Sequence, residues 1–162
     1  MYSECQLSLA KKVLQSASNI ILHLDATGSV IRKTSLSPTF LYSLILPTPI
    51  KGEPSLPLLE WLSDSHNSRS ISSAMFNWWL AARNVIPAPN VIVTDFSWAL
   101  LHSVAHVFNH MSLENQLKSQ WKVLTGECDA AGFVSLRLCA SHYIKALGNR
   151  LTKMAIGKQV RS

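Results

Sequence analysis

The chain has 162 residues, which is the size of one ordinary domain. Its composition, 48% hydrophobic and 15% charged, excludes an intrinsically disordered protein, because such chains are poor in apolar residues and rich in one charge sign. The 15 lysines and arginines against 9 acidic residues give a net charge of +6, which fits a polyanionic partner such as DNA without requiring one.

The sequence also argues against a secreted or membrane protein. Its three cysteines, Cys5, Cys128 and Cys139, show no repeated spacing, which indicates a reducing compartment rather than a disulfide scaffold. Residues 1–15 include charged side chains and lack the continuous apolar core of a signal peptide. No apolar run approaches the roughly 18 residues that a membrane span needs, so we expect no membrane partner.

The N-terminal third predicts a short helix followed by three antiparallel strands. The helix is expected over residues 5–16, and the apolar, β-branched residues 19–24 predict a buried strand. Residues 25–28 (DATG) are typical of a type I turn that closes a hairpin. The returning strand is then expected over residues 30–34, and a third strand over residues 39–46.

The middle of the chain predicts a loop, helices and one strand. Several prolines indicate a loop over residues 47–57, and residues 58–83 favour a helical region with a break near residues 64–68. Residues 91–93 predict a fourth strand. Residues 97–111 predict the clearest helix, because their apolar side chains fall on one broad face.

The remaining residues complete an α/β pattern. We expect a helix over residues 112–124, a loop over 126–132, a fifth strand over 133–138 and a last helix over 141–153. Three antiparallel strands followed by alternating strands and helices imply an α/β fold, with a mixed five-stranded sheet flanked by helices.

Two aspartates follow predicted strands. Asp25 ends the first strand and Asp95 ends the fourth, and neighbouring strand ends bring distant residues together in an α/β sheet. Two carboxylates there suit Mg²⁺, which prefers oxygen ligands and keeps positions open for phosphate oxygens and water. The alternatives are that Asp25 only accepts hydrogen bonds at its turn, and that Asp95 caps the helix that starts near Ser97.

Three blocks of the sequence resemble the catalytic domain of Mutator-like DDE transposases, which belong to the ribonuclease-H-like superfamily. Residues 22–32 (LHLDATGSVIR) resemble the first-aspartate block, and residues 91–101 (VIVTDFSWALL) resemble the second. Residues 138–142 (LCASH) are similar to the Cys-x-x-His element that follows the fifth strand in that family. The blocks stand in the family's order, and the match covers about residues 18–155.

The resemblance implies a fold, an activity and a site. We expect residues 1–17 to lead into a partial ribonuclease-H-like domain over residues 18–162. Asp25 and Asp95 are then the first two catalytic acids, which bind Mg²⁺ or Mn²⁺ for cleavage and transfer of DNA strands. The implied partner is the DNA of transposon ends and the implied location is the nucleus, while homo-oligomerisation stays open.

This sequence departs from the family's pattern at the third acid. In the family it is a glutamate on a later helix, whereas here no acidic residue follows Asp129, and Glu114 and Glu127 precede the Cys-x-x-His element. We therefore expect a fragment, a truncated product or a decayed copy, with an incomplete catalytic set. The alternatives are a domesticated, non-catalytic DNA- or protein-binding module and a relic without function.

Cys139 and His142 allow two interpretations. A lone Cys-x-x-His is half of a structural zinc site, which needs four ligands, and only Cys128 offers itself as a third, so zinc is not expected. The simpler expectation is a buried Cys139 with His142 on the first turn of a helix. Within the family resemblance, the pair positions the substrate or steadies the active site.

Other features have simple structural explanations. His102, His106 and His110 have the spacing of metal-binding helices but lie opposite the apolar face, which predicts exposure to solvent. Tryptophans can stack on nucleic-acid bases, but Trp78 and Trp79 occur in an apolar helical pattern and are expected in the core or on a docking surface. The cationic residues after Asp129 predict a solvated helix face or a DNA contact; they are Arg137, Lys145, Arg150, Lys153, Lys158 and Arg161.

Overall fold

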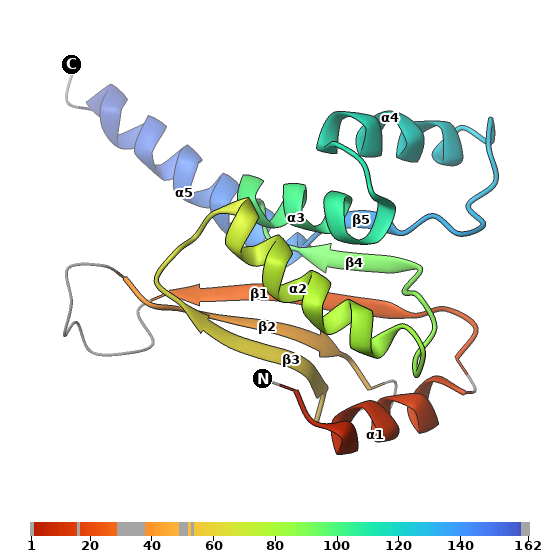
Figure 1. Cartoon of the computed structure of the whole chain (residues 1–162). Helices are drawn as coiled ribbons and strands as arrows, with labels where there is room; N and C mark the ends of the chain where they lie inside the picture. Colours follow the sequence, from red (N-terminus) through yellow and green to blue (C-terminus); the bar gives the residue numbers. More distant parts are fainter. Residues whose placement is uncertain (1, 16, 29–37, 49–51, 53, 160–162) are drawn as a thin grey trace.

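A computed structural model describes residues 2–15, 17–28, 38–48, 52 and 54–159, with only the backbone of residues 146 and 153–159. Five strands form one mixed sheet in the order β3-β2-β1-β4-β5 (Figure 1). Strands β1, β2 and β3 are antiparallel neighbours, while β4 and β5 run parallel to β1. The α/β class and the mixed five-stranded sheet are therefore confirmed. The strands are β1 (Ile21–Gly28), β2 (Phe40–Leu46), β3 (Leu56–Ser63), β4 (Val91–Thr94) and β5 (Ser135–Leu138).

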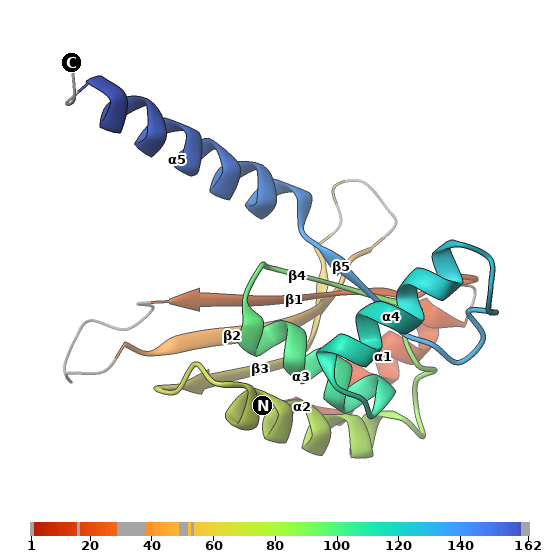
Figure 2. The ribbon, with the colours of Figure 1, turned by 90° about the horizontal axis from the view of Figure 1, so that it is seen from above.

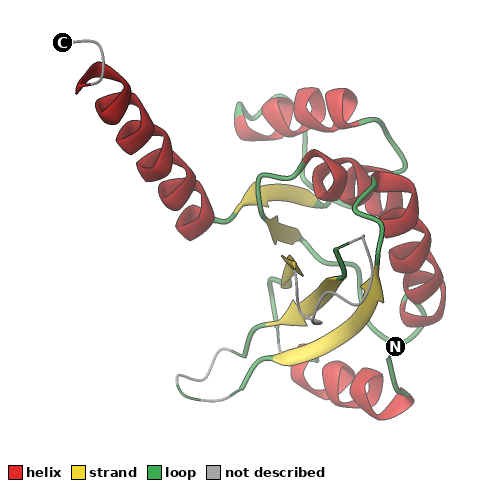
Figure 3. Ribbon diagram, turned by 90° about the vertical axis from the view of Figure 1, so that its left-hand side faces the viewer, coloured by secondary structure: helices red, strands yellow, loops and turns green. Residues whose placement is uncertain are grey.

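The helices divide unequally between the two faces of the sheet. Figures 2 and 3 show α2, α3 and α4 on one side, while α5 leaves the opposite side and extends away from the sheet. Helix α1 packs against the edge strand β3. Among the described residues, no helix is both long and apolar enough to cross a membrane. The helices are α1 (Glu4–Leu14), α2 (Ser68–Ala82), α3 (Trp98–Asn109), α4 (Leu113–Leu124) and α5 (Ala140–Gln159).

The core lies between the sheet and the helices α2 and α3. Leu22 and Leu24 of β1 alternate with His23 and Asp25, so that one face of the strand is buried and the other is accessible. Trp78 of α2 is one of the largest fully buried side chains of this core, which confirms its predicted place. Helix α1 contributes to the same core through Leu7, Ala10 and Leu14.

Strand β3 contradicts the prediction of a loop over residues 47–57 followed by a helix from residue 58. Leu56–Ser63 pairs with β2 in antiparallel register, and the helix α2 begins only at Ser68. Leucine-rich segments of this length fit a helix or a buried strand equally well, so pairing with β2 decides the outcome. Pro57 is tolerated because β3 is an edge strand and because the register shifts beside its partner, Ile45.

The predicted turn at residues 25–28 is also wrong. All four residues belong to β1, where Asp25 pairs with Ser43 and Gly28 pairs with Phe40. Asp25 therefore lies inside a strand that continues for three residues beyond it. The local DATG pattern favours a turn, but pairing with β2 stabilises the extended conformation instead. The predicted strand over residues 30–34 lies outside the described residues.

The other elements are close to their predicted positions. The predicted helix over residues 5–16 corresponds to α1, and the strands expected over 39–46, 91–93 and 133–138 correspond to β2, β4 and β5. The predicted helices after residues 97, 112 and 141 correspond to α3, α4 and α5. Helix α5 is longer than expected, because it continues to Gln159.

Side-chain amides, rather than another strand, hydrogen-bond the outer edge of β5. Asn109 of α3 accepts from the N–H of Val134 at 3.0 Å and donates to its C=O at 2.8 Å, and Gln116 of α4 donates to the same C=O at 3.0 Å. Gln120 accepts from the N–H of Leu136 at 2.8 Å and donates to its C=O at 2.9 Å. Each amide offers both a donor and an acceptor, as a backbone peptide does, so α4 satisfies the edge of β5.

Replacing Gln116 with leucine should lower the free energy of unfolding by about 1–3 kcal/mol. Gln116 is fully buried, and its loss leaves Asn109 and the Val134 carbonyl with fewer hydrogen bonds in a place that water does not reach. Chemical denaturation followed by circular dichroism measures the change. Asn115→Leu, on the exposed side of α4, is the matched control and should change stability by less than about 0.5 kcal/mol. Equal effects of both substitutions would contradict this role of Gln116.

Candidate functional site

The carboxyl ends of three parallel strand segments lie side by side in the sheet. Leu24 of β1 pairs with Thr94 of β4, and Thr94 pairs with Leu138 of β5. The backbone N–H of Cys139 donates to the carbonyl of Thr94 at 2.8 Å, which extends this alignment by one residue. The residues that directly follow the aligned positions are Asp25, Asp95 and Cys139.

The structure brings the two predicted aspartates together. The carboxyl groups of Asp25 and Asp95 lie within hydrogen-bonding reach of each other, and both side chains are half-buried. Partial burial of Asp95 is the main cause that raises its pKa above the ordinary value, and the nearby charge of Asp25 raises it further. His142 acts in the opposite direction but does not cancel the rise. Two carboxyl groups so close together repel when both are ionised, and a cation between them would relieve that repulsion.

Cys139 and His142 join the same cluster. The Nδ1 atom of His142, on the first turn of α5, contacts Oδ1 of Asp95 directly. One ligand atom each from Asp95, Cys139 and His142 all lie within 4.8 Å of one another. The expectation that Cys139 is a buried apolar residue is wrong, because its side chain is partly accessible and faces these polar groups. The position of His142 at the start of a helix is confirmed.

The structure contradicts both purely structural roles considered for the aspartates, the turn for Asp25 and the helix cap for Asp95. Asp25 does not sit in a turn, because it pairs with Ser43 inside the sheet. Asp95 does not cap α3, because the N-cap residue of that helix is Ser97, and no side chain makes a capping hydrogen bond there. The carboxyl groups are instead directed to each other and, for Asp95, to His142.

Removing the charge of Asp95 should stabilise the metal-free protein at neutral pH. The folded state raises the pKa of Asp95, so its contribution to stability is present at low pH and is lost as the pH rises through the folded-state pKa. We therefore expect Asp95→Asn to unfold at a higher temperature than wild type at pH 7 in EDTA, and the difference to shrink toward pH 3. Thermal unfolding across this pH range measures the effect. A lower melting temperature of the variant at pH 7 would contradict it.

Two further polar side chains, His23 and Arg137, lie on the accessible face of the sheet near the carboxyl groups. His23 lies two residues before Asp25 in β1, and therefore on the same face of the strand. Arg137 of β5 pairs with Val93, which in turn pairs with His23, so the three occupy one row across the sheet. His23 and Arg137 are both exposed. This face thus presents an imidazole and a guanidinium group one row away from Asp25.

A hydrogen-bond chain that no sequence pattern predicts supports the loop carrying Asp95. The hydroxyl of the fully buried Tyr42 bonds to Nδ1 of His66 at 2.8 Å, and Nε2 of His66 bonds to Oγ of Ser97 at 2.9 Å. The N–H of Ser97 donates to the backbone carbonyl of Asp95 at 2.8 Å. Trp61 stacks on Tyr42 with ring centroids 4.7 Å apart. These residues come from β2, the loop after β3 and the loop after β4, which only the folded sheet brings together.

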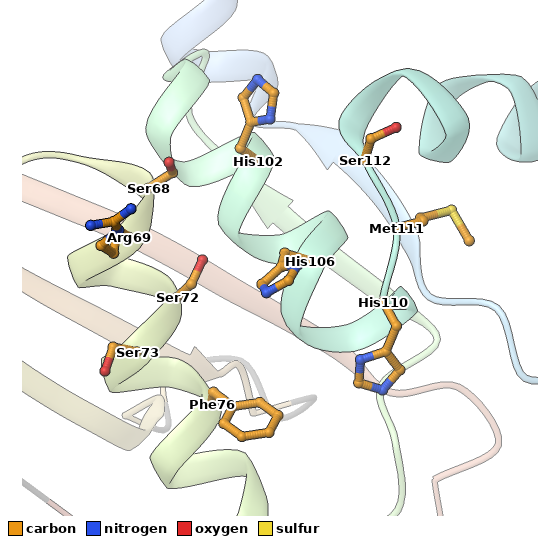
Figure 4. A pocket seen from close by; sticks show the side chains of 10 residues that line it. All are labelled: Ser68, Arg69, Ser72, Ser73, Phe76, His102, His106, His110, Met111 and Ser112. Carbon is orange, nitrogen blue, oxygen red and sulfur yellow. The ribbon is translucent and has the colours of Figure 1, made fainter.

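His102 and His106 of α3 and His110, its C-cap residue, are exposed, as predicted, and line a groove between α2 and α3 (Figure 4). The groove has a volume of about 710 Å³, and its described lining contains no acidic side chain. In the described part of the chain, three potential metal ligands converge only at Asp95, Cys139 and His142, so the histidines do not form a metal cluster. The groove residues are Ser68, Arg69, Ser72, Ser73, Phe76, His102, His106, His110, Met111 and Ser112.

The candidate site therefore consists of Asp25, Asp95, Cys139 and His142, where β4 and β5 end beside the interior of β1. It combines oxygen, sulfur and nitrogen donors on a rigid sheet that is accessible to solvent. Comparison with family models, curated proteins and solved structures gives no match for this chain. What the site can do is thus argued from its geometry and chemistry.

Proposed function

We propose that this chain is the ribonuclease-H-like core of a DDE-type transposase, which acts on DNA in a metal-dependent reaction. The observation that carries the proposal is the proximity of the carboxyl groups of Asp25 and Asp95, where β4 ends beside its parallel neighbour β1. Three antiparallel strands followed by two parallel ones, in the order β3-β2-β1-β4-β5, are compatible with a ribonuclease-H-like sheet.

The donor set fits a divalent ion. Asp25 and Asp95 would hold it through carboxylate oxygens, the ligands that Mg²⁺ and Mn²⁺ prefer. Bound there, the ion supplies Lewis-acid stabilisation of charge on a phosphodiester. The exposed Arg137 and His23 favour a phosphate group on this face of the sheet, because both can donate hydrogen bonds to its oxygens. The sheet and the Tyr42–His66–Ser97 chain keep Asp95 in place.

The same proposal limits what the chain does alone. A DDE reaction needs a third acid, and none follows Asp129 in this sequence. We therefore expect these residues to bind a metal ion and to present it to DNA, but not to turn over. The cationic segment after Asp129 adds sequence-independent affinity, since each lysine or arginine on a phosphate releases a counterion.

The test is the dependence of DNA binding on Mn²⁺. Affinity for a short duplex is measured by fluorescence anisotropy with Mn²⁺ and with EDTA at matched ionic strength. We expect tighter binding with Mn²⁺ in the wild type, and no such difference in Asp25→Asn/Asp95→Asn. Asp129→Asn, an exposed acid in a loop away from the site, should behave like the wild type. A supercoiled plasmid incubated with the protein and Mn²⁺ should remain uncut.

Two results would overturn parts of this proposal. Equal DNA affinity with Mn²⁺ and with EDTA in the wild type would show that the aspartates do not present a metal ion to DNA. Plasmid nicking that disappears in Asp25→Asn would show that the two acids suffice for cleavage, against the expected lack of turnover.

One observation favours a second candidate, a non-catalytic DNA-binding module. Helix α5 extends away from the sheet (Figure 1), its Lys145 and Arg150 are exposed, and no acidic residue follows Asp129 in this sequence. Such a helix can bind the phosphate backbone without any metal. DNA binding that weakens with salt, survives loss of both aspartates and falls in Lys145→Ala/Arg150→Ala would support this candidate.

A further inference from the structure

We propose that Asp95, Cys139 and His142 form a binding site for a single transition-metal ion of the Zn²⁺ type. The sequence argued against zinc because Cys139 and His142 lacked further ligands nearby. The fold supplies Asp95 as the third donor, from a strand that lies 44 positions away in the chain. Three protein ligands with one open position are the usual composition of a catalytic zinc site.

The distances suit an ion with small local adjustments. The three ligand atoms lie within 4.8 Å of one another, whereas tetrahedral bonds of about 2.0–2.3 Å place ligand atoms roughly 3.5 Å apart. The widest pair of ligand atoms has to close by about 1 Å, while the direct contact between Asp95 and His142 has to open so that the ion fits between them. His142 can make part of both movements, because its side chain is 48% exposed. The backbone carbonyl of Asp95 accepts a hydrogen bond from the N–H of Ser97, which supports the chain at this ligand.

The chemistry of the donors selects the type of ion. A thiolate and an imidazole are poor ligands for Mg²⁺, but they suit Zn²⁺ and Co²⁺, which also accept one carboxylate. The Cys139 thiol gives up its proton to solvent when its sulfur binds the ion, while His142 binds as the neutral ring. A site built from all three donors therefore prefers Zn²⁺ to Mg²⁺.

The ion would also fix the direction of α5. Figures 1 and 2 show this helix extending away from the rest of the molecule, with its first turn as the point of departure. His142 belongs to that turn, Cys139 immediately precedes the helix, and Asp95 directly follows β4 of the sheet. An ion bound by all three connects α5 to the sheet, and it would thereby hold the exposed Lys145 and Arg150 in one orientation.

This site shares Asp95 with the proposed DNA-directed site, but it does not depend on any action on DNA. Asp25 stands beside Asp95 and is the nearest further carboxylate. If oxygen ligands alone hold the ion, Cys139 is not needed. If the mixed set holds it, Cys139 is a direct ligand. Whether the Cys139 sulfur binds the ion therefore distinguishes a site of oxygen ligands alone from the mixed site.

Titration with Co²⁺ under reducing, anaerobic conditions gives the direct test. Cobalt bound to a thiolate shows an intense sulfur-to-metal charge-transfer absorption, and four-coordinate cobalt shows strong visible bands. The protein has two other cysteines, Cys5 and Cys128, both exposed, so the titration uses Cys5→Ser/Cys128→Ser, in which Cys139 is the only thiol. We expect both absorptions to saturate at one Co²⁺ per chain, and equimolar Zn²⁺ to abolish them while a large excess of Mg²⁺ does not.

Two variants in that background assign the ligands. Cys139→Ser should lose the charge-transfer absorption and bind Co²⁺ about 10- to 100-fold more weakly. His142→Gln should keep the charge-transfer absorption but also bind more weakly. Both side chains are partly accessible, and circular dichroism verifies that the variants fold.

The inference fails if Co²⁺ binds to the single-cysteine protein without a charge-transfer absorption, or if Cys139→Ser keeps that absorption. In either case, Mn²⁺-dependent DNA binding through Asp25 and Asp95 would be unaffected, so the two proposals fail separately.

Discussion

Replacing Asp95 with asparagine should weaken Mn²⁺ binding by at least about 100-fold, which is a loss of about 2.7 kcal/mol. Asp95 occupies the centre of the candidate site, since its carboxyl group contacts both Asp25 and His142. An asparagine keeps the shape of the side chain but removes the charge and one good ligand oxygen. Isothermal titration calorimetry with Mn²⁺ measures the affinity.

The controls separate the role of the site from the general charge of the protein. Asp129→Asn removes the same charge from an exposed loop and should leave Mn²⁺ affinity unchanged. Asp25→Asn should weaken binding in the same direction as Asp95→Asn. If Asp129→Asn and Asp95→Asn reduced affinity equally, Mn²⁺ would be binding to surface acids in general rather than to this site.

Trp78→Ala should lower the free energy of unfolding by about 3–5 kcal/mol, the range for large aromatic side chains in a core. The indole of Trp78 is 1% exposed and belongs to the packed core, so its removal leaves a large cavity. Its Nε1 atom is buried without a hydrogen-bond partner among the described residues, which favours the lower end of the range. Chemical denaturation measures the loss.

Trp121→Ala provides the matched control, because the same substitution removes a side chain that is 65% exposed on α4. We expect a change of less than about 1 kcal/mol there. Loss of several kcal/mol in Trp121→Ala would mean that this indole is buried in solution, against its position in the structure.

The position of the candidate site could be predicted from the sequence to a large extent. Short runs such as residues 91–93 predict strands because they are β-branched and apolar, and an aspartate directly after such a run lies at the end of a strand. Neighbouring parallel strands then bring Asp25 and Asp95 together, as the register of Leu24 with Thr94 shows. The contact between the carboxyl groups of Asp25 and Asp95, however, requires β1 and β4 to be neighbours in the sheet, and no local sequence pattern predicts that.

The errors have a common physical cause. Residues 25–28 and residues 58–63 each have a local preference, for a turn and for a helix, which pairing in the sheet overrides. Cys139 was expected in the core because a single cysteine is usually a small buried apolar residue. Its role as a neighbour of Asp95 comes from the pairing of β5 with β4, a contact between segments more than 40 positions apart.

The amide groups that cover the edge of β5 prevent a further strand from pairing with it. A backbone edge that side chains satisfy is chemically intact beneath them, because the N–H and C=O groups of Val134 and Leu136 still point outward. Loss of Asn109, Gln116 and Gln120 together would leave these groups without their side-chain partners, and an extended peptide could then add to the sheet by β-augmentation. Three substitutions thus separate the present closed edge from a peptide acceptor, and they do so without altering a residue of the candidate metal site.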